Sequence, residues 1–468
     1  MTSPTTAADP RWSGPVVATL VLVIGINPAT LHLFIPAMPA IQTAFAIETA
    51  TVQWALSLAL AATAPATLLW GPVSDAVGRR RTLMIASLLI AAGSLAAATA
   101  SSFGALLIGR VVQACGAAAG PVLAASIVFD IHGDRRAGPA LARILVGMIV
   151  ATMTAPFVGG LLTDTVGWRS TFLVTLTLAT LLFVLTWRVL PETHRPADRT
   201  SLRPAPLWSA WYRLLRHPVY LGHALMVACS MAIMYAFMAA APHVMVHLMG
   251  RSASEFGIRL IGVGLGFLAG NLVAARWTTR VGSTPMILIG STLSLAACGG
   301  LTIALMGGAL TPWTIFGPAI VAAFACGLSM PNAEAVALSA SPEASGTASS
   351  LTSGLVLLIA ALTSQAVGWT LNESPRPLGI AMTIAAALAL AAFVGGTIAS
   401  AQQTQPDQQR ERGNADQDTV EAIHQAAMPG QEAAEVLHVR RPLEGRRQQV
   451  AGDARHAHPE GRDSRHRE

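Results

Sequence analysis

The sequence contains about twelve apolar runs, each long enough to cross a membrane as a helix. A helix rises about 1.5 Å per residue, so roughly 20 apolar residues span a hydrocarbon layer of about 30 Å. Only 12% of the residues are charged, whereas a soluble domain carries roughly 25%. The sequence therefore predicts an all-α membrane protein whose spans lie at about residues 15–36, 51–72, 82–100, 103–128, 140–163, 170–190, 218–241, 255–277, 284–306, 311–335, 347–370 and 377–400.

The runs fall into two sets of six, and polar stretches mark the borders. We expect an N-terminal bundle over 15–190 and a C-terminal bundle over 218–400, joined by a proline-containing linker over 191–217. Residues 1–14 and 401–468 flank them. The last segment is dominated by Gln, Arg, Glu, His and Asp, so it cannot bury enough apolar area to offset ordering, and we predict a disordered tail.

Arginine placement predicts the orientation in the membrane. Before residue 400, fifteen arginines fall in loops and flanks that share one side, and four fall on the other side. Because basic residues are retained in the cytoplasm, both termini are expected there. The basic charge follows this topology, so it indicates a lipid bilayer as partner and gives no reason to expect nucleic acid.

The most polar short stretch of the first 130 residues is Gly71-Pro72-Val73-Ser74-Asp75-Ala76-Val77-Gly78-Arg79-Arg80-Arg81. We interpret it as a tight connection between two spans, in which Gly71 and Gly78 permit positive φ. Its spacing resembles the signature loop between helices 2 and 3 of the major facilitator superfamily. A related stretch, 270–282, keeps the glycines and basic residues but has no Asp. The resemblance implies two pseudo-repeat bundles with a substrate site at their interface.

Further motifs resemble the bicyclomycin/chloramphenicol-resistance (Bcr/CflA) subfamily, whose members are drug:proton antiporters. The resemblance covers most of residues 16–400 and excludes the tail. It implies a twelve-helix exporter of small amphipathic drugs. The motifs that carry it are Ile35-Pro36-Ala37-Met38-Pro39, Arg110-Val111-Val112-Gln113-Ala114-Cys115-Gly116, Pro156-Phe157-Val158-Gly159-Gly160, Leu190-Pro191-Glu192-Thr193 and Met330-Pro331-Asn332.

Three polar residues are candidates for a proton or substrate cavity. Arg110 lies about 10 Å inside the fourth span, so it either faces a cavity or clamps backbone carbonyls. Gln113 lies one turn further and is expected on the same surface. His32 stands where relatives usually carry an acid, at a depth that Arg110 also reaches. One hypothesis makes His32 the titrating group; the alternative is a neutral, hydrogen-bonded packing residue.

Two further groups are candidates for gates. Asp130 ends the fourth span on the side of Arg79 and Arg80, and we predict that an ion pair of Asp130 with Arg79 or Arg80 latches the inside-closed state, with Asp75 holding the loop. In the fifth span, small residues around a proline predict close helix packing at the outer gate; these are Ala151, Ala155, Pro156, Gly159 and Gly160. Aromatic and methionine residues could line an adaptable cavity or simply pack in the core: Phe34, Trp54, Met226, Met231, Met234, Tyr235, Phe237 and Met238.

The sequence thus predicts a secondary active multidrug transporter of a bacterial inner membrane, acting as a monomer by proton antiport on chloramphenicol- or bicyclomycin-like drugs. No cofactor or metal site is expected, because the tail histidines fit a solvated segment. A sugar or metabolite permease of the same fold is the alternative. A membrane sensor is a second alternative, disfavoured by the lack of a foldable cytoplasmic domain. An enzyme is not expected, since the spans contain no H-E-x-x-H or nucleophile–base motif.

Overall fold

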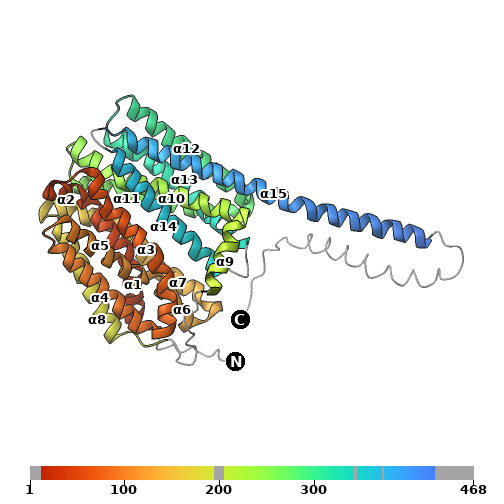
Figure 1. The fold of residues 1–468 in the computed structure, drawn as a ribbon, viewed down its shortest axis with the longest axis horizontal. Helices are drawn as coiled ribbons and strands as arrows, with labels where there is room; N and C mark the ends of the chain where they lie inside the picture. The colour runs from red at the N-terminus through yellow and green to blue at the C-terminus, as the bar shows by residue number, and fades with distance from the viewer. Residues whose placement is uncertain (1–11, 194–204, 341–344, 372–373, 427–468) are drawn as a thin grey trace, which may run out of the picture. The chain divides into compact units, whose positions relative to one another are not determined.

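The computed structural model describes residues 12–193, 205–340, 345–371 and 374–426, and this part of the chain is helical with short turns (Figure 1). The first half comprises α1 (Gly14–Phe34), the 3-10 turn η2 (Ile35–Ala37), α2 (Met38–Phe45), α3 (Thr49–Val77), α4 (Arg79–Ala98), α5 (Phe103–Ala117), α6 (Ala119–His132), α7 (Asp134–Thr165) and α8 (Arg169–Arg188). The second half comprises α10 (Pro218–His243), the π-helical turn η4 (Val244–Leu248), α11 (Ala253–Val281), α12 (Ser283–Met306), α13 (Pro312–Ser339), α14 (Ser345–Thr370) and α15 (Arg376–Ala426). Between the halves lies α9 (Ala205–Arg216).

The described residues contain twelve helices that are long and apolar enough to cross a membrane, as the sequence predicts. Three of them combine shorter pieces. One runs from Gly14 to Phe45 through the turn at Pro36, one joins α5 to α6 over Phe103–His132, and one joins α10 to η4 over Pro218–Leu248. The fold is therefore the expected all-α membrane bundle.

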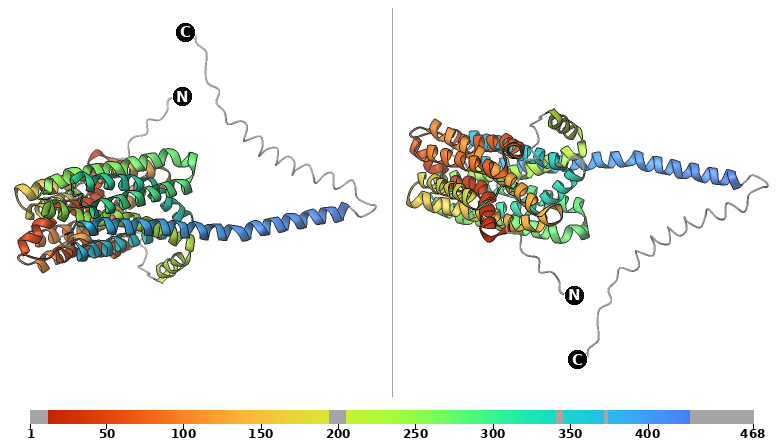
Figure 2. Two further views of the ribbon diagram at one scale, coloured as in Figure 1. Left: turned by 90° about the horizontal axis from the view of Figure 1, so that it is seen from above. Right: turned by 90° about the horizontal axis from the view of Figure 1, so that it is seen from below.

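Two helix pairs carry most of the contact between the halves, α3 with α14 and α7 with α11. Both views in Figure 2 show the spans running side by side as one bundle over residues 12–400. We call the end at which α3 and α11 begin the outer end and the opposite end the inner end, following the arginine count. The two pairs therefore hold the halves together from opposite flanks.

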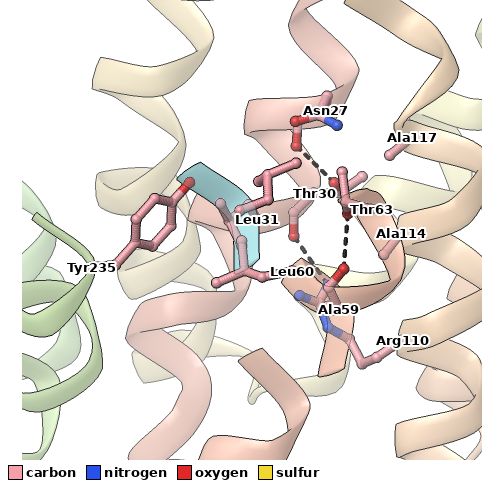
Figure 3. Close-up of a pocket in the computed structure, with 11 residues that line it drawn as sticks. Asn27, Thr30, Leu31, Ala59, Leu60, Thr63, Arg110, Ala114, Ala117 and Tyr235 are labelled. Atoms are coloured by element: carbon pink, nitrogen blue, oxygen red, sulfur yellow. Dashed lines mark hydrogen bonds between the residues drawn. The ribbon is translucent and has the colours of Figure 1, made fainter. Parts of the chain in front are cut away.

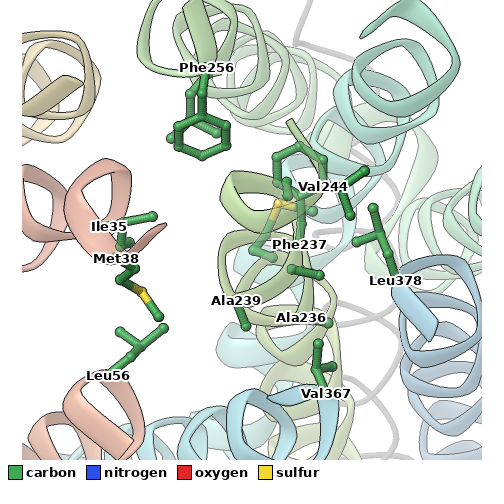
Figure 4. Packing of buried hydrophobic residues seen from close by; sticks show 14 of the residues in the cluster. Ile35, Met38, Leu56, Ala236, Phe237, Ala239, Val244, Phe256, Val367 and Leu378 are labelled. Atoms are coloured by element: carbon green, nitrogen blue, oxygen red, sulfur yellow. The ribbon is translucent and has the colours of Figure 1, made fainter. Parts of the chain in front are cut away.

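A buried apolar cluster spans the interface near the outer end (Figure 4). From the first half, Ile35, Met38 and Leu56 face the second half, which contributes Phe237 and Phe256. All five side chains are at most 3% exposed. This cluster closes the space between the halves on the outer side.

The connection predicted at residues 71–83 is shorter than expected. Gly71 to Val77 continue α3, and only Gly78 separates α3 from α4. Gly78 has φ +106°, which requires glycine, whereas Gly71 is helical. Gly282 joins α11 to α12 with φ +91°, so the second half repeats this turn.

Two borders differ from the prediction. The linker contains α9, an amphipathic helix, and α15 continues beyond residue 400 to Ala426. A composition that excludes a packed core does not exclude a helix, because Gln, Glu, Arg and Ala are all good helix formers. Residues 401–426 continue α15 as a helix, residues 427–468 lie outside the described part, and the disorder of the tail stays a prediction.

Candidate functional site

A cavity of about 40 Å³ lies between the two halves (Figure 3). Tyr235 of α10 and Leu357 of α14 close it from the second half. The rest of the lining comes from α1, α3 and α5, namely Asn27, Thr30, Leu31, Ala59, Leu60, Thr63, Arg110, Ala114 and Ala117. Its mixture of apolar walls with a few polar groups is typical of a small-molecule site. Its volume is below the roughly 300–1,000 Å³ of a drug-sized pocket, so the halves must move apart for a drug to enter.

Arg110 is buried at this cavity, with 2% of its surface exposed. Its Nη1 donates to the Thr30 carbonyl at 3.2 Å and to Gln113 Oε1, and its Nε donates to the Ala55 carbonyl at 3.4 Å. The guanidinium carbon lies 4.1 Å from the centre of the Phe34 ring. Arg110 thus clamps backbone carbonyls of α1 and α3, and it also lines the cavity, so both of its predicted roles have a geometric basis.

Gln113 supports Arg110 from behind. Its side-chain nitrogen donates to Ser94 Oγ at 2.8 Å, and Ser94 donates to the Ile90 carbonyl at 2.6 Å. The helices α4 and α5 approach closely here, because a Cβ on Gly93 would collide with the backbone of α5. Gln113 shares a hydrogen bond with Arg110 as expected but does not line the cavity. Its observed contacts position the guanidinium.

Sequence reasoning missed most of the polar lining, which consists of Asn27, Thr30 and Thr63. An asparagine in the middle of an apolar run was the available signal. Among the aromatic and methionine candidates, Tyr235 lines the cavity and Phe34 contacts Arg110, whereas Met226 and Phe237 belong to the buried core.

His32 lies at the depth of Arg110 but on the opposite face of α1. Thr30 and Phe34 contact Arg110, and at 3.6 residues per turn His32 projects about 160° from each of them. It shares instead the face of Gly25, whose added Cβ would touch α7. The side chain is 8% exposed, and its Nδ1 has no hydrogen-bond partner in the described part. The expected direct coupling to Arg110 is therefore not formed.

Charged residues at the inner end form a cluster around Arg79. The guanidinium pairs with Asp75 and with Asp130 Oδ2, the latter at 3.0 Å from Nε, and its Nη1 also donates to Ser74. The backbone nitrogen of Arg79 donates to Glu192 Oε1 at 2.8 Å. These contacts join α3, α4, α6 and the segment after α8.

The structure forms one of the two predicted ion pairs. Arg79 pairs with Asp130, whereas Arg80 donates to the carbonyls of Thr186 and Trp187. The pair also lies wholly within the first half and is formed while the outer ends are joined. The cluster braces the first half, and its role as a latch of the inside-closed state stays a prediction.

The small residues of the fifth span pack α7 against both α11 and α1. A Cβ on Gly160 would meet the Ala253 backbone, and one on Gly257 would meet Pro156 and Phe157. Gly159 packs against the Leu33 carbonyl of α1, and Ala155 belongs to a small buried cluster with Leu33. Asp164 accepts hydrogen bonds from Ala253 N at 3.2 Å and Ser254 N at 2.8 Å, at the outer end of the same seam.

A second seam, between α3, α14 and α10, is polar and buried. Gln53 donates to the Ala239 carbonyl and accepts from Ser364 Oγ at 3.3 Å. Gln365 accepts from Ser57 Oγ at 2.8 Å and donates to the Ala50 carbonyl at 3.1 Å. All these bonds cross from one half to the other near the outer end. The cavity is thus sealed on the outer side by two seams and an apolar cluster.

A cavity at the interface of two six-helix halves defines the class of the protein, a membrane transporter. The sequence profile of the Major Facilitator Superfamily matches residues 20–364, and the chain belongs to this superfamily. Its fold and family are those of transporters and not of enzymes.

Relatives of the chain agree with the Bcr/CflA subfamily. It is 28% identical to the uncharacterized MFS-type transporter YdgK of Bacillus subtilis, over 80% of this chain and 92% of the relative. It is 25% identical to multidrug resistance protein D of Escherichia coli, over 83% and 97%. It is 23% identical to a bicyclomycin resistance protein homolog of Haemophilus influenzae, over 81% and 94%.

Solved structures confirm the fold. A D-xylose–proton symporter superposes with a TM-score of 0.62 at 17% identity, over 81% of this chain and 97% of the symporter. A bacterial homolog of the lysosomal transporter Spinster, in an inward-facing conformation, gives 0.61 at 18% identity, over 84% and 96%.

Proposed function

We propose that this protein exports small amphipathic drugs from the bacterial cytoplasm across the inner membrane, as a monomer with both termini in the cytoplasm. The observation that supports this proposal is the central cavity, which is lined by both halves. Its outer end is sealed by contacts between the two halves. Breaking those contacts would expose the cavity to the outer side. Relatives named for drug resistance favour chloramphenicol- or bicyclomycin-like substrates.

We further propose that drug export is driven by proton exchange. His32 is the candidate proton site, since it is a buried histidine whose Nδ1 has no hydrogen-bond partner in the described part. The imidazole lies on the α7 side of α1, and α7 forms the outer seam with α11. A proton on His32 would therefore act through the packing of α1 on α7, and not through Arg110.

Everted membrane vesicles test both proposals. Wild-type protein should accumulate radiolabelled chloramphenicol, and collapse of the pH gradient should abolish accumulation. His32→Gln, which keeps a hydrogen-bonding side chain but cannot titrate, should bind the drug and lose the dependence on the gradient. Undiminished pH-driven accumulation by His32→Gln would refute the role of His32. Absence of gradient-driven uptake of any tested drug by wild-type protein would refute drug export.

A sugar or metabolite permease is the second candidate. The solved neighbours favour it in fold only, because their identity to this chain is below 20%. Competition in the same vesicles discriminates the two functions. If the protein is a drug exporter, an excess of xylose or nucleosides should not inhibit chloramphenicol uptake into the vesicles. A second apolar drug should inhibit it.

A further inference from the structure

The cavity lining contains one positive charge, that of Arg110, and no carboxylate among the described residues. We propose that the cavity binds neutral or anionic ligands through an oxygen acceptor held by Arg110, and that it rejects organic cations. This inference rests on the proposed export function, because it names the substrate class of the same cavity. It is carried by the donors that Arg110 leaves unused and by the placement of carboxylates.

Arg110 has donors left over for a ligand. A guanidinium carries five N–H groups, and three of them are used, two from Nη1 and one from Nε. Nη2 has no acceptor among the described residues, although the side chain is 98% buried and lines the cavity. Nη2 is not one of the fully buried unpaired atoms of the described residues, so it is open to the cavity. An oxygen of a carbonyl, nitro or carboxylate group in the cavity would satisfy it.

The other lining groups suit an amphipathic body around that oxygen. The hydroxyls of Thr30 and Thr63 donate to carbonyls of their own helices, at 2.8 Å each, so lone pairs remain for a ligand's donors. The Tyr235 hydroxyl has no partner within the described residues, and it lies at the cavity on the α10 side (Figure 3). The remaining walls are formed by the polar Asn27 and by apolar residues, namely Leu31, Leu60, Leu357 and three alanines.

Carboxylates that would attract a cation are distant. No Asp or Glu among the described residues lines the cavity. Glu334 of α13 lies 22 residues from the outer start of its helix at Pro312, about 33 Å by helical rise, whereas Arg110 lies about 10 Å from the start of α5. A cationic ligand would therefore meet the Arg110 charge with no opposing carboxylate, and like charges repel strongly at low dielectric. An anion would form a charge-assisted hydrogen bond.

Two dyes that share a three-ring xanthene body test the inference. Fluorescence anisotropy would measure binding of anionic fluorescein and cationic rhodamine 123 to the full-length protein in lipid nanodiscs. Fluorescein should bind and be displaced by neutral chloramphenicol, and rhodamine 123 should bind about tenfold more weakly or worse. Arg110→Gln should weaken fluorescein binding by about tenfold or more, while Arg110→Lys keeps the charge and should restore part of it. Equal binding of the two dyes by wild type, or unchanged fluorescein binding by Arg110→Gln, would overturn the inference.

A second variant covers the case in which Arg110→Gln does not fold, since Arg110 also clamps helices. Thr63→Asp places a carboxylate on the cavity wall and leaves every Arg110 hydrogen bond in place. It should improve rhodamine 123 binding and weaken fluorescein binding, and unchanged selectivity would contradict the inference. Selective binding without export in vesicles would reject the proposed function alone. Export of both dyes at equal rates would reject the charge selection alone.

Discussion

The buried guanidinium of Arg79 forms ion pairs with two carboxylates at the inner end. Arg79 binds Asp75, Asp130 and Ser74, and its backbone nitrogen binds Glu192. Four segments of the first half therefore meet at a single residue. A lone buried cation would be costly, so the surrounding carboxylates are what makes its burial possible.

Asp130→Asn should destabilise the protein by about 1–3 kcal/mol, because it leaves the Arg79 Nε without a charged acceptor. Thermal unfolding in detergent would measure the loss. Arg81→Gln is the matched control, since Arg81 is exposed, and surface substitutions usually stay within about 0.5 kcal/mol. Equal effects of the two variants would show that the cluster does not brace the first half.

Single residues also show what the sequence could and could not predict. The depth of Arg110 followed from helical rise alone. The face on which His32 lies depended on which helices pack around α1, and no local pattern contains that information. Asn27, Thr30 and Thr63 were not recognised as cavity residues either. Short polar side chains are as common in helix packing as in binding sites.

Among the elements, α3 and α14 form the polar outer seam. Gln365 makes two bonds across it, to Ser57 and to the Ala50 carbonyl. A neutral hydrogen bond contributes about 1 kcal/mol, so the two together can shift the equilibrium between outer-closed and outer-open states by roughly tenfold or more. The seam can therefore favour the outer-closed state while still allowing the outer end to open.

Gln365→Leu should expose the cavity to the outer side. A cysteine introduced at Thr63, in a background with the four native cysteines replaced, should react faster with a membrane-impermeant maleimide when Gln365 is Leu. Asn271→Leu serves as control, because among the described residues the Asn271 side chain bonds only the Phe267 carbonyl of its own helix. An unchanged labelling rate in Gln365→Leu would contradict a gating role for the seam.

The α7–α11 pair depends on close backbone contact at Gly257. A Cβ there would lie 2.7 Å from Phe157 Cα, so Gly257→Ala should separate the helices at a cost of about 1–3 kcal/mol. We expect reduced drug export with normal membrane insertion, measured in everted vesicles. Gly299→Ala, with no atom within 4 Å of the added carbon, should export normally. Loss of export in both variants would point to a general folding defect.

For the whole molecule, the twelve spans and the two halves followed from hydrophobic length, which is a property of each segment alone. The second half also repeats the glycine turn, at Gly282, as predicted from its sequence. Inter-helix registers were beyond sequence reasoning, since they depend on which small residues meet across the interface. The end of the last helix was misjudged because the absence of a core was taken as the absence of a helix.

The central claim is that the halves close at the outer end around the cavity and open there during transport. Pulsed electron paramagnetic resonance between spin labels at Thr43 of α2 and Thr370 of α14, both exposed at the outer end, tests this most directly. We predict two distances, a short one for the conformation described above and a longer one, whose ratio changes when chloramphenicol saturates the cavity. A single distance that does not respond to bound drug would contradict the account.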